Sequence, residues 1–226
     1  MTRLVLKHWR AKLLHAIKLF LYCFPLFSSP TYKLPFFEKK EFNPSFELYK
    51  ENDLAMMDNF SFTNQFGKLM TEKDLHGKIT VVNFFFSECQ GICPMTLARL
   101  QRFKKRFDHI KNIQILSISI TPNKDTPERL LKYSKELNII DNNWFFLTGQ
   151  EDSVLSYVRK IFQADKKTRT RGEKSFIHSD NVFLIDSKKR FRGIYNGQKT
   201  SSLNLLLQDL ITISALSLNL LHHGSL

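Results

Sequence analysis

The stretch that decides the fold is ITVVNFFFSECQGICPMTLARLQRF, residues 79–103. Its first part, Ile79–Phe86, is an almost uninterrupted apolar run, which indicates a buried strand. Pro94 then opens a segment in which apolar side chains recur at helical spacing, so a helix with one inward face follows. The turn between strand and helix carries two cysteines, Cys89 and Cys93, with three residues between them. This unit predicts both the centre of the fold and a chemically active turn.

The position of the two cysteines favours thiolates. At a helix N-terminus, the helix dipole and the free backbone N–H groups lower the pKa of a thiol. If the turn is already helical, positions i and i+4 project from one face, so both sulfurs can reach one target. Two thiolates suit Cu(I) or Zn, and the same pair can close a disulfide and exchange electrons. Cysteines that are merely small buried side chains are the plain alternative, but these would more often lie within the apolar run itself.

The rest of the chain continues to alternate strands and helices. The expected strands are 60–66, with Gly67 at a hairpin turn, then 78–86, 113–120, 144–147, 182–185 and 192–195. The expected helices are 94–107, 125–137, 153–162 and one from Ser201 onwards. This order predicts an α/β, thioredoxin-like fold, with a central mixed sheet flanked by helices. Because right-handed crossovers bring strand ends to one edge, the cysteine turn and the loop that holds His178 can meet there.

The last helix carries a stripe of apolar side chains at spacings of three and four, which is typical of a core-facing helix. The stripe comprises Leu205, Leu206, Leu210, Ile213, Leu216, Leu220 and Leu221. A membrane span is not expected, since the uncharged run from Leu210 to Leu221 has only 12 residues and a span needs about 20.

A Cys-x-x-x-Cys-Pro turn after a Phe-rich strand resembles the SCO/SenC family of copper proteins, which assist assembly of cytochrome c oxidase. Further segments match the family at the right distances. There are three of them: Ser117–Glu128, Trp144–Gly149, and Phe176–Asp180 with its histidine His178, followed by Val182–Asp186. With the cysteine turn they make four. The resemblance extends over roughly residues 56–215. Each segment alone is weak, because thioredoxin relatives share it, but the four in this order are specific.

The resemblance implies a copper metallochaperone with Cys89, Cys93 and His178 as the metal ligands. Two thiolates and one imidazole suit both Cu(I) and Cu(II). The implied partner is a copper-accepting oxidase subunit or another acidic redox partner. The other histidines lie in the N-terminal segment, in polar turns or at the C-terminal end. They are His8, His15, His76, His109, His222 and His223.

The chain departs from the family pattern at two places. Many members carry Pro and Asp between the cysteines, where this chain has Gln90 and Gly91. Many also carry Asp just before the histidine, where this chain has Ile177. The missing acids can change metal affinity or redox potential, although no ligand is lost. Asp180 is a candidate to orient the histidine ring in their place.

The N-terminal end predicts export. Residues 1–18 hold five basic residues and no acid, and the apolar stretch Leu19–Phe27 and small residues follow. Residues 1–30 therefore indicate a signal peptide or short signal anchor, which would put the protein on the periplasm-facing or extracytoplasmic side of a membrane, anchored or secreted. Residues 31–50 are expected to be an extended linker, 51–221 the thioredoxin-like SCO domain and 222–226 a tail.

The charge balance is strongly basic, with 34 Lys and Arg against 21 Asp and Glu and a net charge of +13. Nucleic-acid binding is not expected, because no basic helix with interleaved aromatics and no known motif supports it. A basic stretch at 165–174 precedes His178. It either steers an acidic partner to the metal or is a solvated loop, and the sequence leaves both open. The three cysteines, Cys23 among them, are too few for a disulfide scaffold.

An enzyme is the second functional reading: an exported thiol–disulfide oxidoreductase, or a thiol peroxidase, with Cys89 as nucleophile and Cys93 as resolving thiol. Two features favour copper. Three residues separate the cysteines, where thioredoxin-type oxidoreductases have two. A histidine, and no proline, stands just ahead of the strand at Val182, where those enzymes usually carry a cis-proline.

Overall fold

The computed structural model describes residues 33–46, 50–163 and 180–223, with side chains up to residue 216. Residues Leu34–Leu226 belong to one compact unit. The predicted signal segment and His178 therefore lie outside the described residues.

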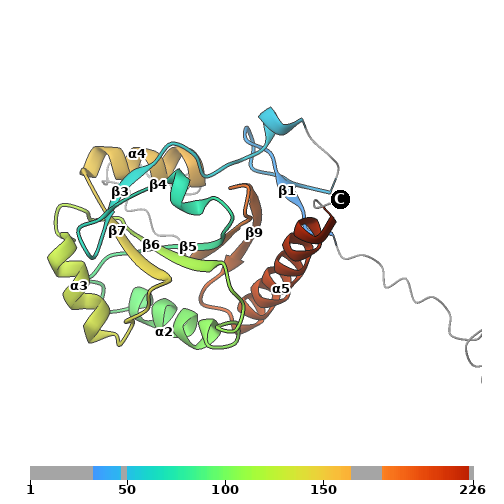
Figure 1. The fold of residues 1–226 in the computed structure, drawn as a ribbon. Coiled ribbons are helices and arrows are strands. Elements are labelled where there is room, and N and C mark those ends of the chain that lie inside the picture. Colours follow the sequence, from blue (N-terminus) through green and yellow to red (C-terminus); the bar gives the residue numbers. More distant parts are fainter. Residues whose placement is uncertain (1–32, 47–49, 164–179, 224–226) are drawn as a thin grey trace, which may run out of the picture. The chain divides into compact units, whose positions relative to one another are not determined.

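A seven-stranded mixed sheet forms the centre of this unit, in the order β4-β3-β7-β6-β5-β8-β9 (Figure 1). The strands are β3 (Ser61–Asn64), β4 (Leu69–Thr71), β5 (Ile79–Phe85), β6 (Ile113–Ser119), β7 (Trp144–Thr148), β8 (Asn181–Ile185) and β9 (Phe191–Asn196). β5, β6 and β7 are parallel, while the outer strands pair antiparallel. The predicted thioredoxin-like arrangement, including the hairpin around Gly67, is confirmed.

Helices cover both faces of the sheet. They are α2 (Ile92–Lys104), α3 (Pro127–Glu136), α4 (Glu151–Phe162) and α5 (Thr200–His223). Figure 1 shows α4 on one face and α2, α3 and α5 on the other. Two apolar clusters match this division, since one contains Leu100, Leu130 and Leu206 and the other contains Val158 and Phe162. The sheet is thus covered on both sides, so every residue of β5 and β6 is buried, the polar ones included.

Helix α5 packs on the sheet with only part of its predicted stripe. Leu206, Leu210 and Ile213 are buried, as expected, but Leu205 and Leu216 are 52% and 51% exposed. The prediction from the spacing of apolar residues therefore included more of the helix surface than is buried. Within the described residues, no helix is long and apolar enough to cross a membrane.

Residues 34–45, part of the expected linker at 31–50, belong to the compact unit. They include β1 (Phe36–Phe37) and β2 (Pro44–Ser45), and Leu34 and Phe37 are buried. Short 3-10 helices follow at Glu51–Asp53 and Glu72–Leu75. The proline-rich composition that suggested an extended linker is compatible with short edge strands.

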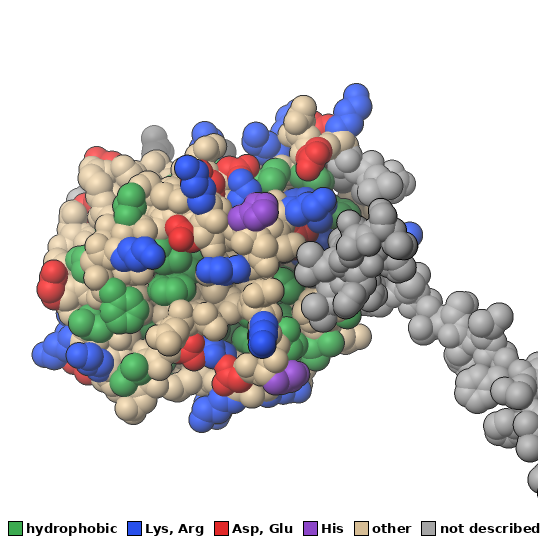
Figure 2. Space-filling model, in the orientation of Figure 1, with side chains coloured by type: hydrophobic (Ala, Val, Ile, Leu, Met, Phe, Trp, Pro, Cys, Tyr) green, Lys and Arg blue, Asp and Glu red, His purple; other side chains and the backbone are tan. Residues whose placement is uncertain are grey.

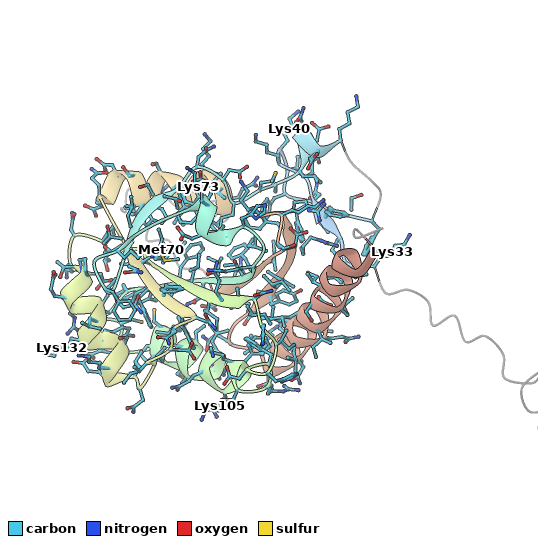
Figure 3. The ribbon with its side chains drawn as sticks, in the orientation of Figure 1. Lys33, Lys40, Met70, Lys73, Lys105 and Lys132 are labelled. Atoms are coloured by element: carbon cyan, nitrogen blue, oxygen red, sulfur yellow. The ribbon has the colours of Figure 1, made fainter. Side chains whose placement is uncertain are left out.

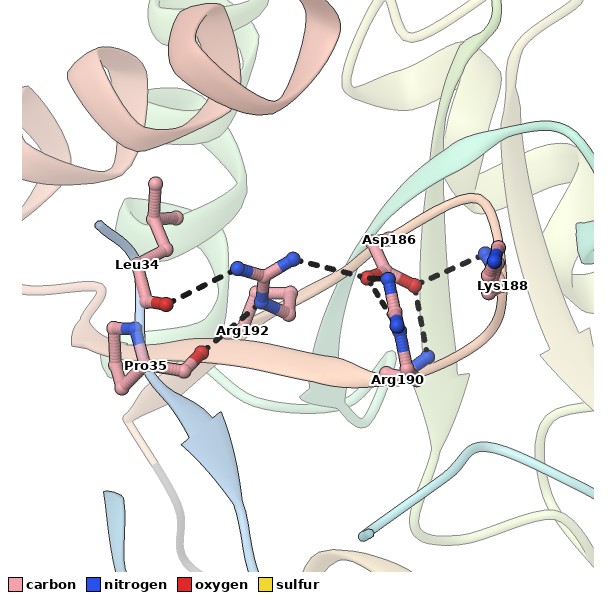
Figure 4. Close-up of polar contacts among 6 residues, drawn as sticks. All are labelled: Leu34, Pro35, Asp186, Lys188, Arg190 and Arg192. Atoms are coloured by element: carbon pink, nitrogen blue, oxygen red, sulfur yellow. Dashed lines mark hydrogen bonds and ion pairs between the residues drawn. The ribbon is translucent and has the colours of Figure 1, made fainter. Parts of the chain in front are cut away.

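Arg192 of β9 holds this N-terminal segment in place (Figure 4). Its guanidinium donates to the carbonyl oxygens of Leu34 and Pro35, at 3.1 and 3.0 Å, and to Asp186 at 3.1 Å. It also lies 4.1 Å from the ring centroid of Phe36. Arg192 and Leu34 are 158 residues apart in the sequence, so the sequence around Leu34 does not predict this contact.

Basic side chains are spread over the surface. On the face seen in Figure 2, Lys and Arg side chains stand apart from one another, with acidic and apolar side chains between them. Figure 3 shows Lys40, Lys105 and Lys132 pointing outward from separate elements. On this face the charge is distributed as on an ordinary solvated surface.

Candidate metal centre

The cysteine turn, residues 86–93, joins the end of β5 to the first turn of α2. The helix begins at Ile92, two residues earlier than Pro94 suggested, with Gly91 as its N-cap. Pro94 is tolerated there because the first-turn N–H groups have no partner within a helix. Gly91 offers no side-chain cap, so those N–H groups remain available to other acceptors.

The sulfur of Cys89 is one of these acceptors. Both cysteines are free thiols of intermediate exposure. Partial burial works to raise the pKa of Cys89, but the backbone N–H groups of Cys93, Gly91 and Ile92 donate to its sulfur and hold the pKa below its usual value. The thiol of Cys93 also hydrogen-bonds to it.

Cys93 has the opposite environment. Burial raises the pKa of its thiol to about 12, and its proximity to Cys89 adds to the shift, although the backbone N–H of Phe86 donates to its sulfur. The hydrogen bond between the two cysteine side chains shows that the sulfurs face one another. Cys89 lies before the N-cap of α2, so the two sulfurs meet through the fold of the turn and not, as the sequence suggested, from one face of a helix.

A cavity of about 260 Å³ opens beside the two sulfurs. It is lined by Phe84, Phe85, Phe86, Cys89, Gly91, Ile92, Cys93, Thr96, Ile120 and Asp180. Asp180 directly precedes β8, so the structure brings the start of that strand to the cysteine turn, as the topology predicted. His178, two residues earlier, lies outside the described residues.

The donor set fits a soft ion. Two facing sulfurs in a largely apolar recess offer Cu(I) the thiolates that it prefers. Among the described residues, no three His, Cys, Asp or Glu side chains come together as a metal site. His178 as a third ligand stays a prediction. His76 and His109 are exposed, as expected of polar turns.

The buried carboxylate of Asp125 supports the cysteine turn. The sequence analysis did not identify it as part of the site. Asp125 is fully buried, and its Oδ2 accepts from the backbone N–H of Ser87 at 3.3 Å and from the hydroxyls of Ser119 and Thr121 at 2.5 and 3.1 Å. Thr126, the next residue, is the N-cap of α3, which leaves Asp125 free to turn inward.

Arg129 of α3 adds a second link to the same place. Its Nε donates to the hydroxyl of Ser87 at 3.1 Å. Ser87 lies two residues before Cys89, so both contacts fix the start of the cysteine turn. The only sequence signal was the run Asp125-Thr126-Pro127-Glu128, whose polar residues also suit an ordinary helix start.

Comparisons with known proteins agree with this geometry. A family model described as SCO1/SenC matches residues 49–212. The chain is 29% identical to the SCO1 protein homolog of Bacillus subtilis over 160 residues, which are 70% of this chain and 82% of the relative.

Two solved structures share the fold. A SCO1/SenC family lipoprotein from Bacillus anthracis is 28% identical, with a TM-score of 0.62 over 71% of this chain and 96% of the other. The protein BsSco, described as a member of the Sco family of cytochrome c oxidase assembly proteins with a disulfide switch, is 27% identical, with a TM-score of 0.61 over 71% and 94%. From the family match over most of the compact unit, the cysteine turn and the sheet around it, we conclude that this chain belongs to the SCO1/SenC family.

Proposed function

We propose that this protein is a copper metallochaperone that delivers copper to the copper centre of cytochrome c oxidase. The observation that carries the proposal is the pair of facing thiols, Cys89 and Cys93, at the mouth of a largely apolar cavity. Membership of the SCO1/SenC family supports it, as does the description of BsSco as belonging to a family of oxidase assembly proteins. Copper is the cargo here, and the protein's task is to hold it and release it.

Each ligand has a distinct part in this proposal. Cys89 meets the ion as a thiolate, because backbone N–H groups stabilise its charge. Cys93 supplies the second sulfur and gives up its proton when it binds. His178 is the proposed third ligand; its imidazole adds the harder donor that Cu(II) needs and Cu(I) can dispense with. A pair of thiolates with one exchangeable ligand can pass the ion to an acceptor that offers its own thiolates.

Metal analysis of the reduced protein tests the assignment. We expect one copper per chain, and we expect Cys89→Ala or Cys93→Ala to abolish tight binding. His178→Ala should weaken Cu(II) binding first, because two thiolates still hold Cu(I). His109→Ala is a matched control, since His109 is exposed and away from the cavity lining. Unchanged copper content in His178→Ala, in both oxidation states, would remove the histidine from the site.

The oxidoreductase reading is tested by the same preparation. The contrast between the two thiols, one with a lowered and one with a raised pKa, is also what a nucleophile and its resolving partner require. We expect an added disulfide oxidant to form a Cys89–Cys93 disulfide, in which two thiols lose two protons and two electrons to the oxidant. Copper binding should then be lost, and reductant should restore it. Preloaded Cu(I) should slow the oxidation; equal rates with and without copper would favour the enzyme.

Location follows as a separate part of the proposal. We propose that the N-terminal segment keeps its basic end in the cytoplasm and places the domain on the extracytoplasmic side, as the positive-inside bias of residues 1–18 suggests. We would fuse after Leu226 a reporter enzyme that works only outside the cytoplasm, and we expect this fusion to show activity. Activity of a reporter that works only inside the cytoplasm would contradict this orientation.

A further inference from the structure

The outer side of α2, the helix that carries Cys93, is basic. The helix contains no acidic residue. Apolar residues of the helix lie buried in the core, and basic side chains follow one another on the opposite side at intervals of three and four. With the turn that follows the helix, this side carries Arg99, Arg102, Lys105 and Arg106. All are exposed except Arg99, which is half-buried, and Figure 3 shows Lys105 pointing outward. We call these four residues the basic face.

The charges of the basic face have no carboxylate partner in the described part of the chain. None of the ion pairs there involves any of its residues. Lys104, whose side chain is only 12% exposed, shows the contrast, because its ammonium pairs with Asp108 and, at 2.5 Å, with Asp141. The fold thus neutralises the inward cation of this helix and leaves the outward cations to anions from outside.

Neutral amides hold two of the guanidinium groups in place. Arg99 donates to the amide oxygen of Gln198, in the turn before α5, at 2.5 Å. Arg106 donates to the amide oxygen of Asn204 in α5 at 2.7 Å. An amide oxygen orders a guanidinium without cancelling its charge. Because an ordered side chain loses less conformational entropy on binding, these two arginines can meet a carboxylate at lower cost than a freely moving cation.

Two apolar side chains lie where the helix meets the cysteine turn. Ile92 and Met95 are 43% and 49% exposed. Ile92 also lines the cavity beside the two sulfurs. Met95 precedes Arg99 by four positions and Arg102 by seven, so it lies on the same side of the helix as they do. An apolar patch bordered by charged groups is the arrangement found in protein–protein interfaces.

We propose that Ile92, Met95 and the basic face form the docking surface for the protein that accepts copper, and that this partner presents carboxylates around a small apolar patch. The inference rests on the proposed function, in which the ion leaves through the mouth of the cavity. Charge complementarity identifies the partner, since unneutralised cations favour an acidic surface and speed its approach. An anionic membrane would also attract these cations, but it offers no ligand to copper.

Removal of two charges tests the surface. Arg102→Gln combined with Lys105→Gln, in the full-length protein loaded with Cu(I), changes two exposed side chains and keeps helix propensity. The probe is the copper-free, copper-accepting subunit of cytochrome c oxidase. At about 0.01 M salt we expect the second-order rate constant of copper transfer to fall about 10-fold. At about 1 M salt the variant should match the wild type, because screening is then nearly complete. The copper content before mixing should equal that of the wild type.

Lys68→Gln combined with Lys188→Gln is the matched control. Both lysines are exposed. They lie in hairpin turns at the end of the sheet opposite to the cysteine turn, next to the first residues of β7 and β5. This variant loses the same charge, and we expect transfer as fast as in the wild type. An equal fall in both double variants would show a response to net charge alone and would overturn the proposal.

The apolar part of the surface has its own test. Met95→Gln places an amide in the patch, and we expect slower transfer at both salt concentrations, by about fivefold. Met95→Leu keeps the apolar contact and should match the wild type. A loss in Met95→Leu as large as that in Met95→Gln would show that the thioether sulfur is what transfer needs, and would contradict a docking role for this residue.

Calorimetry with the copper-free, reduced protein separates docking from the proposed function. Weaker binding of the Arg102→Gln, Lys105→Gln variant to the acceptor supports the surface even if no copper is passed, in which case only the proposed function fails. Equal binding and equal transfer by variant and wild type would leave the function standing and overturn the surface. Vesicles of equal parts phosphatidylcholine and phosphatidylglycerol test the alternative. If the two substitutions abolish vesicle binding but leave acceptor binding unchanged, the surface faces a membrane and the proposal fails.

Discussion

Two neighbouring turns at the same edge of the sheet make opposite use of polar groups. The cysteine turn follows β5, and the turn at residues 120–126, here called the Asp125 turn, follows β6, which is parallel to it. Both lead into helices with a proline in the first turn, Pro94 and Pro127. In the Asp125 turn, side-chain oxygens accept from the backbone N–H groups. In the cysteine turn, the backbone N–H groups donate to the sulfur of Cys89.

The difference shows how one edge combines rigidity with reactivity. In the Asp125 turn, Thr126 caps α3 by accepting from the N–H of Arg129 at 3.3 Å. In the cysteine turn, Gly91 provides no cap, and the helix N–H groups stabilise the charge on Cys89. Because Asp125 also holds the N–H of Ser87, the rigid turn anchors the reactive one. The exposed ion pair between Glu88 and Lys124 adds little.

Removing the anchor should have the largest effect. Asp125→Ala leaves the hydroxyls of Ser119 and Thr121 and the N–H of Ser87 without an acceptor, so we expect the free energy of unfolding to fall by about 3 kcal/mol. Denaturant unfolding measures this. Asp125→Asn, which keeps one accepting oxygen, should lose less. A loss below about 1 kcal/mol in Asp125→Ala would mean that the unpartnered Oδ1 of this carboxylate cancels the gain from its bonds.

The contrast between the two thiols should appear as selective alkylation. The pKa of Cys89 is lowered and that of Cys93 is about 12. Between pH 6 and pH 9, iodoacetamide should therefore modify Cys89 first, on the order of 50-fold faster once the greater nucleophilicity of a high-pKa thiolate is allowed for. Rates rise with pH as thiolate forms, and the rise for Cys89 should come at lower pH than in denatured protein. Equal rates for both thiols in the folded protein would contradict the assignment.

Loss of the cap in the rigid turn should have a moderate effect. Thr126→Ala removes the hydroxyl that accepts from Arg129, and we expect the free energy of unfolding to fall by about 1 kcal/mol. Thr126→Ser should restore it. The alkylation rate of Cys89 should stay as in the wild type, since Asp125 still holds Ser87; a change in that rate would show that the two turns are coupled through the cap as well.

Giving the cysteine turn a cap should have the smallest effect on stability. Gly91 has open space where a Cβ would stand, so Gly91→Asp places a carboxylate beside the N–H groups that serve Cys89. We expect stability to rise by only a few tenths of a kcal/mol, while the pKa of Cys89 rises because it shares its donors and gains a negative neighbour. The pH profile of alkylation should move upward. Gly91→Asn, which offers an acceptor without the charge, controls for added charge, and a profile unmoved in Gly91→Asp would show that the N–H groups are not limiting.

Much of the fold could be predicted from local patterns. The strands at Ile79–Phe85 and Ile113–Ser119 and the helices at 127–136 and 151–162 lie where apolar runs, periodicity and helix starts indicated. The resemblance to the SCO/SenC family is confirmed by the family match. These features depend on residues close together in the chain, and for such features a sequence is informative.

Contacts between segments that are distant in the chain could not be predicted from the sequence. Leu34 was expected in a linker and is held by Arg192, and Leu205 was expected to face the core and is exposed. Each outcome depends on which partner arrives from elsewhere in the chain. Tertiary packing selects these partners, and it cannot be predicted from the residues adjacent in the sequence.

The sequence by itself determined the chemistry of this protein: two thiols with three residues between them at a helix start, after a buried strand. Tertiary structure alone decided the unequal environments of Cys89 and Cys93 and the support of the turn by Asp125. The reason is physical. Donor types and their spacing are covalent properties of the chain, whereas burial, hydrogen-bond partners and the approach of β8 to α2 exist only once the sheet has brought distant segments together.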